Sequence, residues 1–293
     1  MGASGALARE SAVALARRSP EVRAWVGSRG EAEALRRLGA KVAVGDPADR
    51  ETLEVVMSEA HTLCYLAGEP FGPGAESRSR TLPGMVSTAV AAARDAGVRR
   101  VLLLSAVGSS ARSANPHLRA RGRAEEAVRA SGLEHVIVRI THSLFPGGAW
   151  RAVVEALAVR WPGVVVGPGT QVVAPVALPD VASVLAAADD RDRVASGTWS
   201  LEGPEALTAD ELAAALSGRR PRVHLPPRVA ARAASLLGVS LNRASAELLA
   251  VDHRADGPDA AAEFGVVSTP LDLAPRPRPP DLSGPPRGPG PGE

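Results

Sequence analysis

The sequence predicts an α/β fold: a doubly wound parallel sheet followed by a small C-terminal α/β region. Short apolar runs alternate with helical stretches of about 10 to 15 residues as far as residue 140, which is typical of βαβ units. The runs 101–105 and 135–139 are mainly apolar, as expected for strands that are covered on both faces. The first helical stretch follows a turn of small residues, which is the usual start of such a fold.

The elements of the first half follow from periodicity and capping signals. Ala8, Ala12 and Leu15 share one face of a helix that packs on a sheet. Asp49 can cap a later helix. The predicted strands are 21–26, 41–44, 61–66, 101–105 and 135–139; the predicted helices are 5–19, 31–38, 49–60, 82–96 and 118–130, with loops at 68–80 and 106–116.

Beyond residue 144 the pattern becomes less regular. Thr208 and Glu211 have the spacing of a capping box. From residue 275 onward, eight of the nineteen residues are proline, so we expect a disordered tail. The predicted helices here are 150–160, 179–188, 208–216, 227–237, 243–251 and 258–264, and the predicted strands are 164–166 and 198–201; the expected units are 1–145, 146–273 and 274–293.

Composition excludes several classes of protein. The formal net charge is +2 and the basic residues are dispersed, which argues against a nucleic-acid-binding module. No apolar run approaches the roughly 18 residues of a membrane span, so we expect a cytoplasmic protein. The single cysteine, Cys64, lies in an apolar strand and is expected in the core. No group of His, Cys and carboxylate residues has metal-site spacing, and the sequence leaves the oligomeric state open.

The turn before the first helix indicates a phosphate site. Small residues at 2, 5 and 8 match the second half of a dinucleotide-binding turn. Gly2, Ser4 and Gly5 would let the backbone approach a pyrophosphate, and the helix N-terminus from Ala6 would supply free N–H groups. The alternative is an N-terminal helix that merely contains small residues.

Such a turn normally leaves a buried central strand, yet one residue precedes Gly2. Without that strand, two buried strand edges would be left unpaired, at about 1 to 3 kcal/mol for each orphaned group. We therefore expect Met1 to be a late start, with a strand of about five to ten residues upstream of it.

The order of these elements resembles the atypical short-chain dehydrogenase/reductase superfamily, in particular its NmrA-like NAD(P)-binding proteins and the nucleotide-sugar-epimerase-like relatives of a complex I accessory subunit. The resemblance implies a Rossmann-like domain that binds a dinucleotide. Its segments are 2–8, 44–46, 66–68, 96–105, 115–125 and 203–208, with 252–271 similar to the complex I-related subgroup.

The resemblance also implies the cofactor contacts. Asp46 would lie beside the adenine, and Ala67 and Gly68 would contact the cofactor at the end of the predicted strand 61–66. The predicted strand 21–26 is followed by Ser28 and Arg29, and no carboxylate stands at its end. Because a basic residue there accommodates a 2′-phosphate, we expect NADP(H) in preference to NAD(H).

The superfamily's Tyr-x-x-x-Lys pair is missing. Tyr65 and Lys41 are the single tyrosine and lysine, and they lie in the wrong order on different strands. The segment that aligns with the pair places His117 at the tyrosine and Arg121 at the lysine. Histidine suits proton transfer at neutral pH, whereas arginine can only hold the ribose. Ser105 matches the family's serine and could polarise a carbonyl.

Two functions are compatible with these residues. The first is an NAD(P)H-dependent oxidoreductase or isomerase acting on a small organic substrate, with Ser105, His117 and Arg121 as candidate catalytic residues. The alternative is a non-catalytic NAD(P)-binding redox sensor or assembly protein, which the missing dyad favours.

Overall fold

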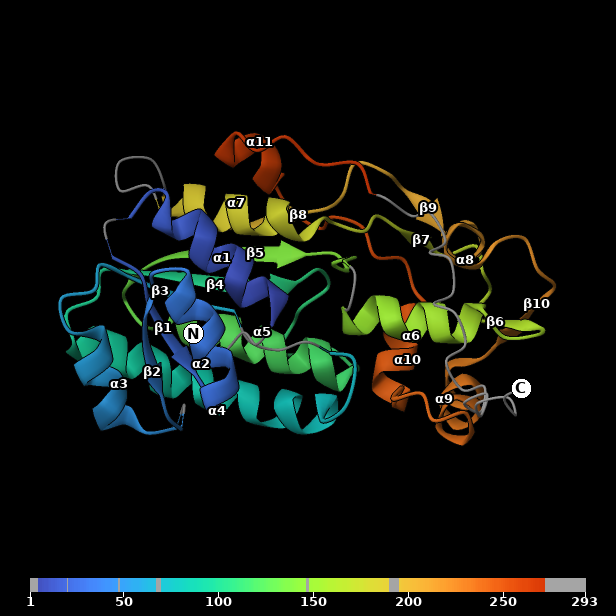
Figure 1. Ribbon diagram of the computed structural model, residues 1–293, viewed down its shortest axis with the longest axis horizontal. Helices are drawn as coiled ribbons and strands as arrows, with labels where there is room; N and C mark the ends of the chain where they lie inside the picture. The colour runs from blue at the N-terminus through green and yellow to red at the C-terminus, as the bar shows by residue number, and fades with distance from the viewer. Residues whose placement is uncertain are drawn as a thin grey trace, which may run out of the picture.

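A four-stranded parallel sheet forms the centre of the molecule (Figure 1). The computed structural model describes residues 5–19, 21–46, 48–66, 70–145, 148–189 and 195–271. Strand β4 is buried along nearly its whole length, as its run of leucines predicts. In order across the sheet, the strands are β3 (Thr62–Tyr65), β4 (Arg100–Ala106), β5 (Glu134–Ile140) and β8 (Gly197–Leu201).

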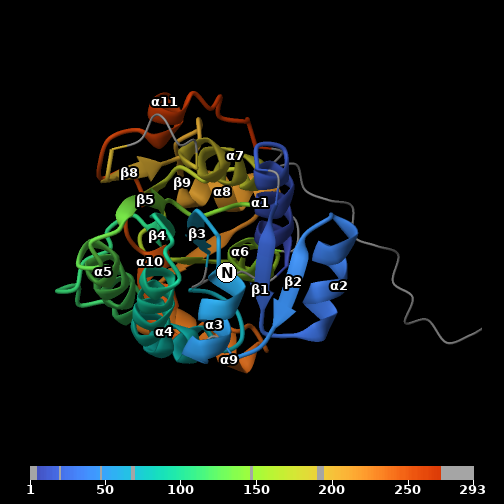
Figure 2. The same cartoon turned by 90° about the vertical axis from the view of Figure 1, so that its left-hand side faces the viewer.

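A second, two-stranded parallel sheet lies beside the first. It consists of β1 (Arg23–Val26) and β2 (Lys41–Val44), with Ala24 opposite Val42. Among the described residues no strand joins β1 to β3, so the two sheets present facing edges to each other (Figure 2). This arrangement is the doubly wound fold that the sequence predicts, divided where a central strand was expected.

Helices cover both faces of the sheets. On one face, α1 (Ala6–Ala16) packs against α7 (Leu178–Ala188), and α11 (Ala260–Phe264) lies next to α7. The opposite face carries α3 (Arg50–Met57), α4 (Ala75–Asp95) and α5 (Pro116–Arg129), while α2 (Arg29–Arg37) packs on the small sheet. Separate apolar cores fill the two interfaces, so β4 and β5 are buried on both sides.

The C-terminal region forms the right-hand part of the molecule in Figure 1. It contains two small sheets that the sequence did not predict as such, since their strands are short or half-exposed. Its elements are α6 (Ala149–Ala158), β6 (Gly163–Val166) with β10 (Arg222–Leu225), β7 (Val172–Val173) with β9 (Leu207–Thr208), α8 (Ala209–Ser217), α9 (Pro227–Leu236) and α10 (Arg243–Leu249).

Two capping predictions are confirmed and one loop prediction is partly wrong. The Asp49 side chain accepts a hydrogen bond from the Thr52 N–H at 3.2 Å, and Thr208 and Glu211 form the capping box. The loop expected over 68–80 ends early, because α4 begins at Ala75. The polar run after Gly74 contains no helix breaker before Pro83.

Four predicted contact residues, Gly2, Ser4, Ala67 and Gly68, lie outside the described residues, as does the predicted disordered tail. No helix in the described ranges has the length and apolar character needed to cross a membrane.

Candidate functional site

A cleft of about 540 Å³ opens at the carboxyl ends of the central strands. Gly5 and Ala6 line it from the N-terminus of α1, Leu66 from the end of β3, and Ser105 from the end of β4. In doubly wound sheets this is where ligands bind, outside the carboxyl ends of the strands and beside a helix N-terminus. The structure therefore brings Gly5 and Ala6, the described part of the predicted phosphate turn, and Ser105 to one cavity.

The start of α1 favours an anion. Gly5 is the N-cap, with φ of +72°, a conformation that glycine adopts without strain. Among the described residues, nothing beyond its chain neighbours lies within 4 Å of the position where a side chain at Gly5 would begin, which leaves the backbone open to a ligand on that side. The first turn of α1 has no acidic residue, and Arg9 also lines the cleft. The helix dipole and Arg9 therefore both favour a negatively charged group such as a pyrophosphate.

Ser105 is tied to a buried carboxylate. Its hydroxyl donates to Glu125 Oε1 at 2.6 Å, and Glu125 is 1% exposed. Arg139 holds the same carboxylate with two bonds, Nε to Oε1 at 3.0 Å and Nη2 to Oε2 at 2.7 Å. The hydrogen bonds that Arg139 donates to Glu125 raise the pKa of its guanidinium. The Ser105 and Ser109 hydroxyl oxygens are 3.2 Å apart. Because the Ser105 hydrogen is directed to Glu125, its oxygen can accept the Ser109 hydroxyl and keeps capacity for one further donor.

Two buried histidines form the inner wall of the cleft. His142 and His253 line it with their ring centroids 4.0 Å apart, and His142 stacks on Trp150 at 4.7 Å. The Nε2 atoms of both histidines are buried and have no hydrogen-bond partner in the described part of the chain. Burial holds the pKa of His142 well below its usual value and lowers that of His253 to about 4. Both rings are therefore neutral at physiological pH.

Arg121 also lines the cleft, from α5, but His117 does not. His117 is 1% exposed; its Nδ1 contacts the Ser79 hydroxyl of α4, and its Nε2 contacts the Ser245 hydroxyl of α10 at 3.2 Å. Burial, followed by the charge of Arg121, lowers the pKa of His117. The His117 imidazole thus connects α5 with α4 and α10, outside the cleft.

The remaining predicted contacts lie at the small sheet. Ser28 is the N-cap of α2 and Arg29 its first residue, both exposed after the end of β1. Asp46 follows β2, and its carboxylate accepts the Ala48 N–H at 2.9 Å. Ser28, Arg29 and Asp46 are not among the residues that line the cleft.

The histidine pair was not among the predicted site residues. His142 follows β5 directly, and this position is the signal that could have found it. His253 is 111 positions further along the chain (253 − 142), and nothing local in the sequence links it to the cleft.

Together, the divided parallel sheet, the helix N-terminus and the cleft define a dinucleotide-binding protein of the Rossmann-like class. The sequence model of a family described as NAD(P)H-binding matches residues 2–157. The chain belongs to this NAD(P)H-binding family, as the resemblance in the sequence predicted.

Two curated relatives show the range of functions among similar proteins. A (4-alkanoyl-5-oxo-2,5-dihydrofuran-3-yl)methyl phosphate reductase of Streptomyces griseus is 31% identical, over 94% of this chain and 92% of that one. Subunit 9 of the NADH dehydrogenase [ubiquinone] 1 alpha subcomplex of Arabidopsis thaliana mitochondria is 29% identical over 57% of this chain. The match spans only 42% of that subunit's length.

Solved structures of low sequence identity share the fold. A triphenylmethane reductase of Citrobacter sp. complexed with NADP(H) has a TM-score of 0.72 at 21% identity, with 92% of this chain and 95% of that chain covered. An NADPH-dependent quinone oxidoreductase of Escherichia coli complexed with NADPH gives the same TM-score at 20% identity and the same coverage.

Proposed function

We propose that the protein is an NADPH-dependent reductase of a small conjugated carbonyl compound. The observation that carries this proposal is the cleft, in which the anion-favouring end of α1 and two buried imidazoles share one cavity. The proposal is supported by the full-length relative named as a dihydrofuranone phosphate reductase and by the structural neighbour named as a quinone oxidoreductase.

The residues divide into two groups along the cleft. Gly5, Ala6 and Arg9 would hold the phosphates, and Ser105 with Arg121 would contact the ribose or nicotinamide end. Bound NADPH would supply the hydride. His142 and His253 would hydrogen-bond the carbonyl oxygen in their neutral form, because their lowered pKa values exclude a cationic acid near neutral pH. The proton that completes the two-electron reduction would then come from water.

NADP(H) preference is part of the proposal. Arg29 is exposed in the first turn of α2, after the end of β1, and the same turn also carries Glu31. A guanidinium there can pair with a 2′-phosphate. Arg29→Ala should weaken NADPH binding about tenfold and leave NADH binding unchanged. Equal loss for both cofactors would contradict the assignment.

The activity is tested by following NADPH oxidation with quinones and conjugated lactones as acceptors. We expect His142→Phe to lower kcat/KM about tenfold, the equivalent of one lost hydrogen bond, with the NADPH dissociation constant unchanged. His117→Gln is the matched control, because that histidine lies outside the cleft. Loss of turnover only in the His117 variant would return the catalytic role to His117.

The alternative is a non-catalytic NAD(P)-binding sensor or assembly protein. The positions of the single tyrosine and the single lysine favour this alternative, because neither lies in the cleft. Tyr65 is fully buried in the core, which raises the pKa of its phenol, and Lys41 is paired with Glu21 on the small sheet. The complex I relative is consistent with this alternative. Tight NADPH binding without turnover on any acceptor would establish it and exclude the reductase.

A further inference from the structure

Positive charge is concentrated in one part of the C-terminal region. Between residues 212 and 246 the sequence contains six arginines and no Asp or Glu, although the whole chain has a formal net charge of only +2. This segment forms most of α8, then β10, α9 and the start of α10. In Figure 1, α9 and β10 lie at the opposite end of the molecule from the small sheet of β1 and β2. One end of the protein is therefore basic.

The carboxylates that border this segment are already engaged. Asp210 is hydrogen-bonded to a histidine ring of β10 at 3.0 Å, and Glu247 pairs with Arg243 at 2.9 Å. Arg228 and Arg232 are exposed and form no ion pair among the described residues. With Arg243 they line a surface groove of about 490 Å³ between α9 and α10. The two guanidinium groups can therefore meet negative charge from outside the chain.

Helix α9 exposes a face of arginine and apolar side chains. Ala230 and Ala234 are fully buried, so the helix packs on the body of the protein through its alanines. Arg228, Arg232 and Leu236 follow one another at four-residue spacing on the outward face. Leu236 is 89% exposed. The outward face thus combines two cations with an apolar side chain that protrudes from the surface.

More exposed apolar residues lie beside the end of α9. Arg160, which follows α6, donates to the Leu237 carbonyl oxygen at 3.4 Å, so the end of α6 lies next to the end of α9. Arg220 donates to the Val159 carbonyl oxygen at 2.9 Å and adds a further positive charge at the same place. Trp161 is 75% exposed. Four exposed apolar residues, which we call the apolar tip, therefore gather here: Val159, Trp161, Leu236 and Leu237.

We propose that this end of the protein binds the surface of a bilayer that contains anionic phospholipids, with the apolar tip in the headgroup region and the surrounding arginines paired with lipid phosphates. Guanidinium groups match phosphate geometry, and basic residues beside Trp and Leu are typical of surfaces that lie in the bilayer interface. Shape favours a bilayer over a protein partner, because a fluid interface accepts a protruding side chain such as Leu236 without a matching cavity. The tip and the cleft share no residue, so this proposal stands apart from the proposed reductase activity.

The test mixes the full chain with phosphatidylcholine vesicles, or with vesicles in which about one-third of the lipid is phosphatidylglycerol, and separates bound protein by flotation. We expect at least tenfold tighter binding to the anionic vesicles, and weaker binding as salt is added. Fluorescence gives an independent readout, because Trp25 and Trp150 are buried and Trp199 is half-buried, whereas Trp161 is exposed. The anionic vesicles should shift the emission to the blue, and Trp161→Phe should abolish this shift.

The charge contribution is tested with paired arginine variants. Arg228→Gln with Arg232→Gln should weaken binding to the anionic vesicles at least tenfold, because each arginine near an anionic surface contributes about fivefold. Arg17→Gln with Arg18→Gln is the matched control. It removes the same charge from exposed positions just after α1 and should change binding by less than about twofold.

The apolar contribution is tested with Leu236→Ser, which should weaken binding about tenfold. Val267→Ser is the matched control, because Val267 is equally exposed, at 89%, and lies outside the tip; it should leave binding unchanged. Equal binding to both kinds of vesicle, binding to neither, or equal losses in test and control variants would overturn the proposal. Dimerisation in sedimentation that Leu236→Ser abolishes would instead identify the tip as a contact between two copies of the chain and overturn the bilayer assignment.

Discussion

Mild acid is expected to destabilise the protein through His253. This side chain is 4% exposed, and desolvation lowers its pKa to about 4, against partial compensation by a backbone hydrogen bond at Leu248 and the charge of Asp252. An unfolded chain has a histidine pKa of about 6.5, so the unfolded state binds the proton first as the pH falls. The stabilisation is therefore complete above about pH 6.5 and is lost as the pH falls towards 4.

The magnitude follows from these two pKa values. Lowering the pH from 7.5 to 5 should reduce the free energy of unfolding by about 2 kcal/mol through His253 alone. His142 contributes in the same direction, because its pKa is also lowered by burial. Exposed carboxylates titrate mainly below about pH 4.5, so the window from pH 6.5 to 5 belongs to the buried histidines.

Urea unfolding at pH 7.5, 6 and 5 measures this loss. His253→Phe keeps a ring in the stack beside His142 and removes the titrating group, so its stability should fall by about 2 kcal/mol less over the same pH range. An unaltered pH dependence in the His253 variant would refute the burial argument.

Three further substitutions test the packing and the polar network around the sheet. Gly122→Ala should destabilise the fold by about 1 to 3 kcal/mol in thermal unfolding, because the new methyl group would overlap the backbone of the loop after β4. Unchanged stability would contradict the close packing of α5 on this loop. Glu125→Gln should cost about 1 to 3 kcal/mol, because it leaves Asp256, at 3.0 Å, as the remaining charge partner of Arg139 among the described residues; urea unfolding measures this loss, and a change below about 1 kcal/mol would show that Asp256 and solvent compensate. Asp180→Asn should speed proteolysis near residue 269 several-fold, because the buried carboxylate accepts both the Thr269 N–H and its hydroxyl at 2.7 Å; unchanged cleavage would show that other contacts hold this segment.

Most of the α/β core could be predicted from local patterns. The strands β4 and β5 have continuous apolar runs and the helix between them, α5, has a clear helical period, and each signal lies within its own element. The small sheets of the C-terminal region could not be predicted in the same way. Strand β10 is half-exposed and pairs with β6 about 60 positions earlier in the sequence, so its pairing depends on tertiary contacts.

The cleft shows the same limit. Gly5 and Ala6 were predicted from turn spacing and Ser105 from the resemblance to the superfamily, and the structure places them in one cavity. Arg121 also lines it, whereas His117 packs among three helices. Both residues lie on α5, four positions apart. Spacing along a helix does not by itself reveal which end of the face reaches the cavity, because that depends on where neighbouring helices pack.

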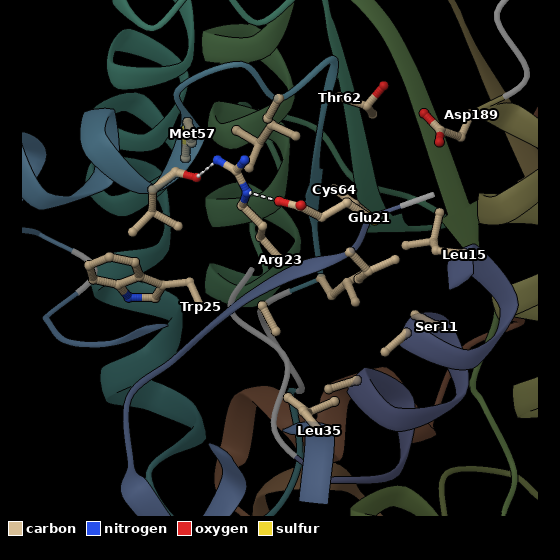
Figure 3. Close-up of a pocket in the computed structure, with 18 of the residues that line it drawn as sticks. Ser11, Leu15, Glu21, Arg23, Trp25, Leu35, Met57, Thr62, Cys64 and Asp189 are labelled. Carbon is tan, nitrogen blue, oxygen red and sulfur yellow. Dashed lines mark hydrogen bonds and ion pairs between the residues drawn. The ribbon is translucent and has the colours of Figure 1, made fainter. Parts of the chain in front are cut away.

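A second cavity, of about 390 Å³, lies between β1 and β3 (Figure 3). The body of α1 lines this cavity, whereas its first residues form the anion-favouring end of the cleft. Packing changes around the second cavity would therefore act on the position of Gly5 and Ala6 through a single rigid helix. Because backbone N–H groups bind phosphate only when they are held at hydrogen-bond distance, the affinity for a dinucleotide would depend on this packing as well as on the residues of the cleft.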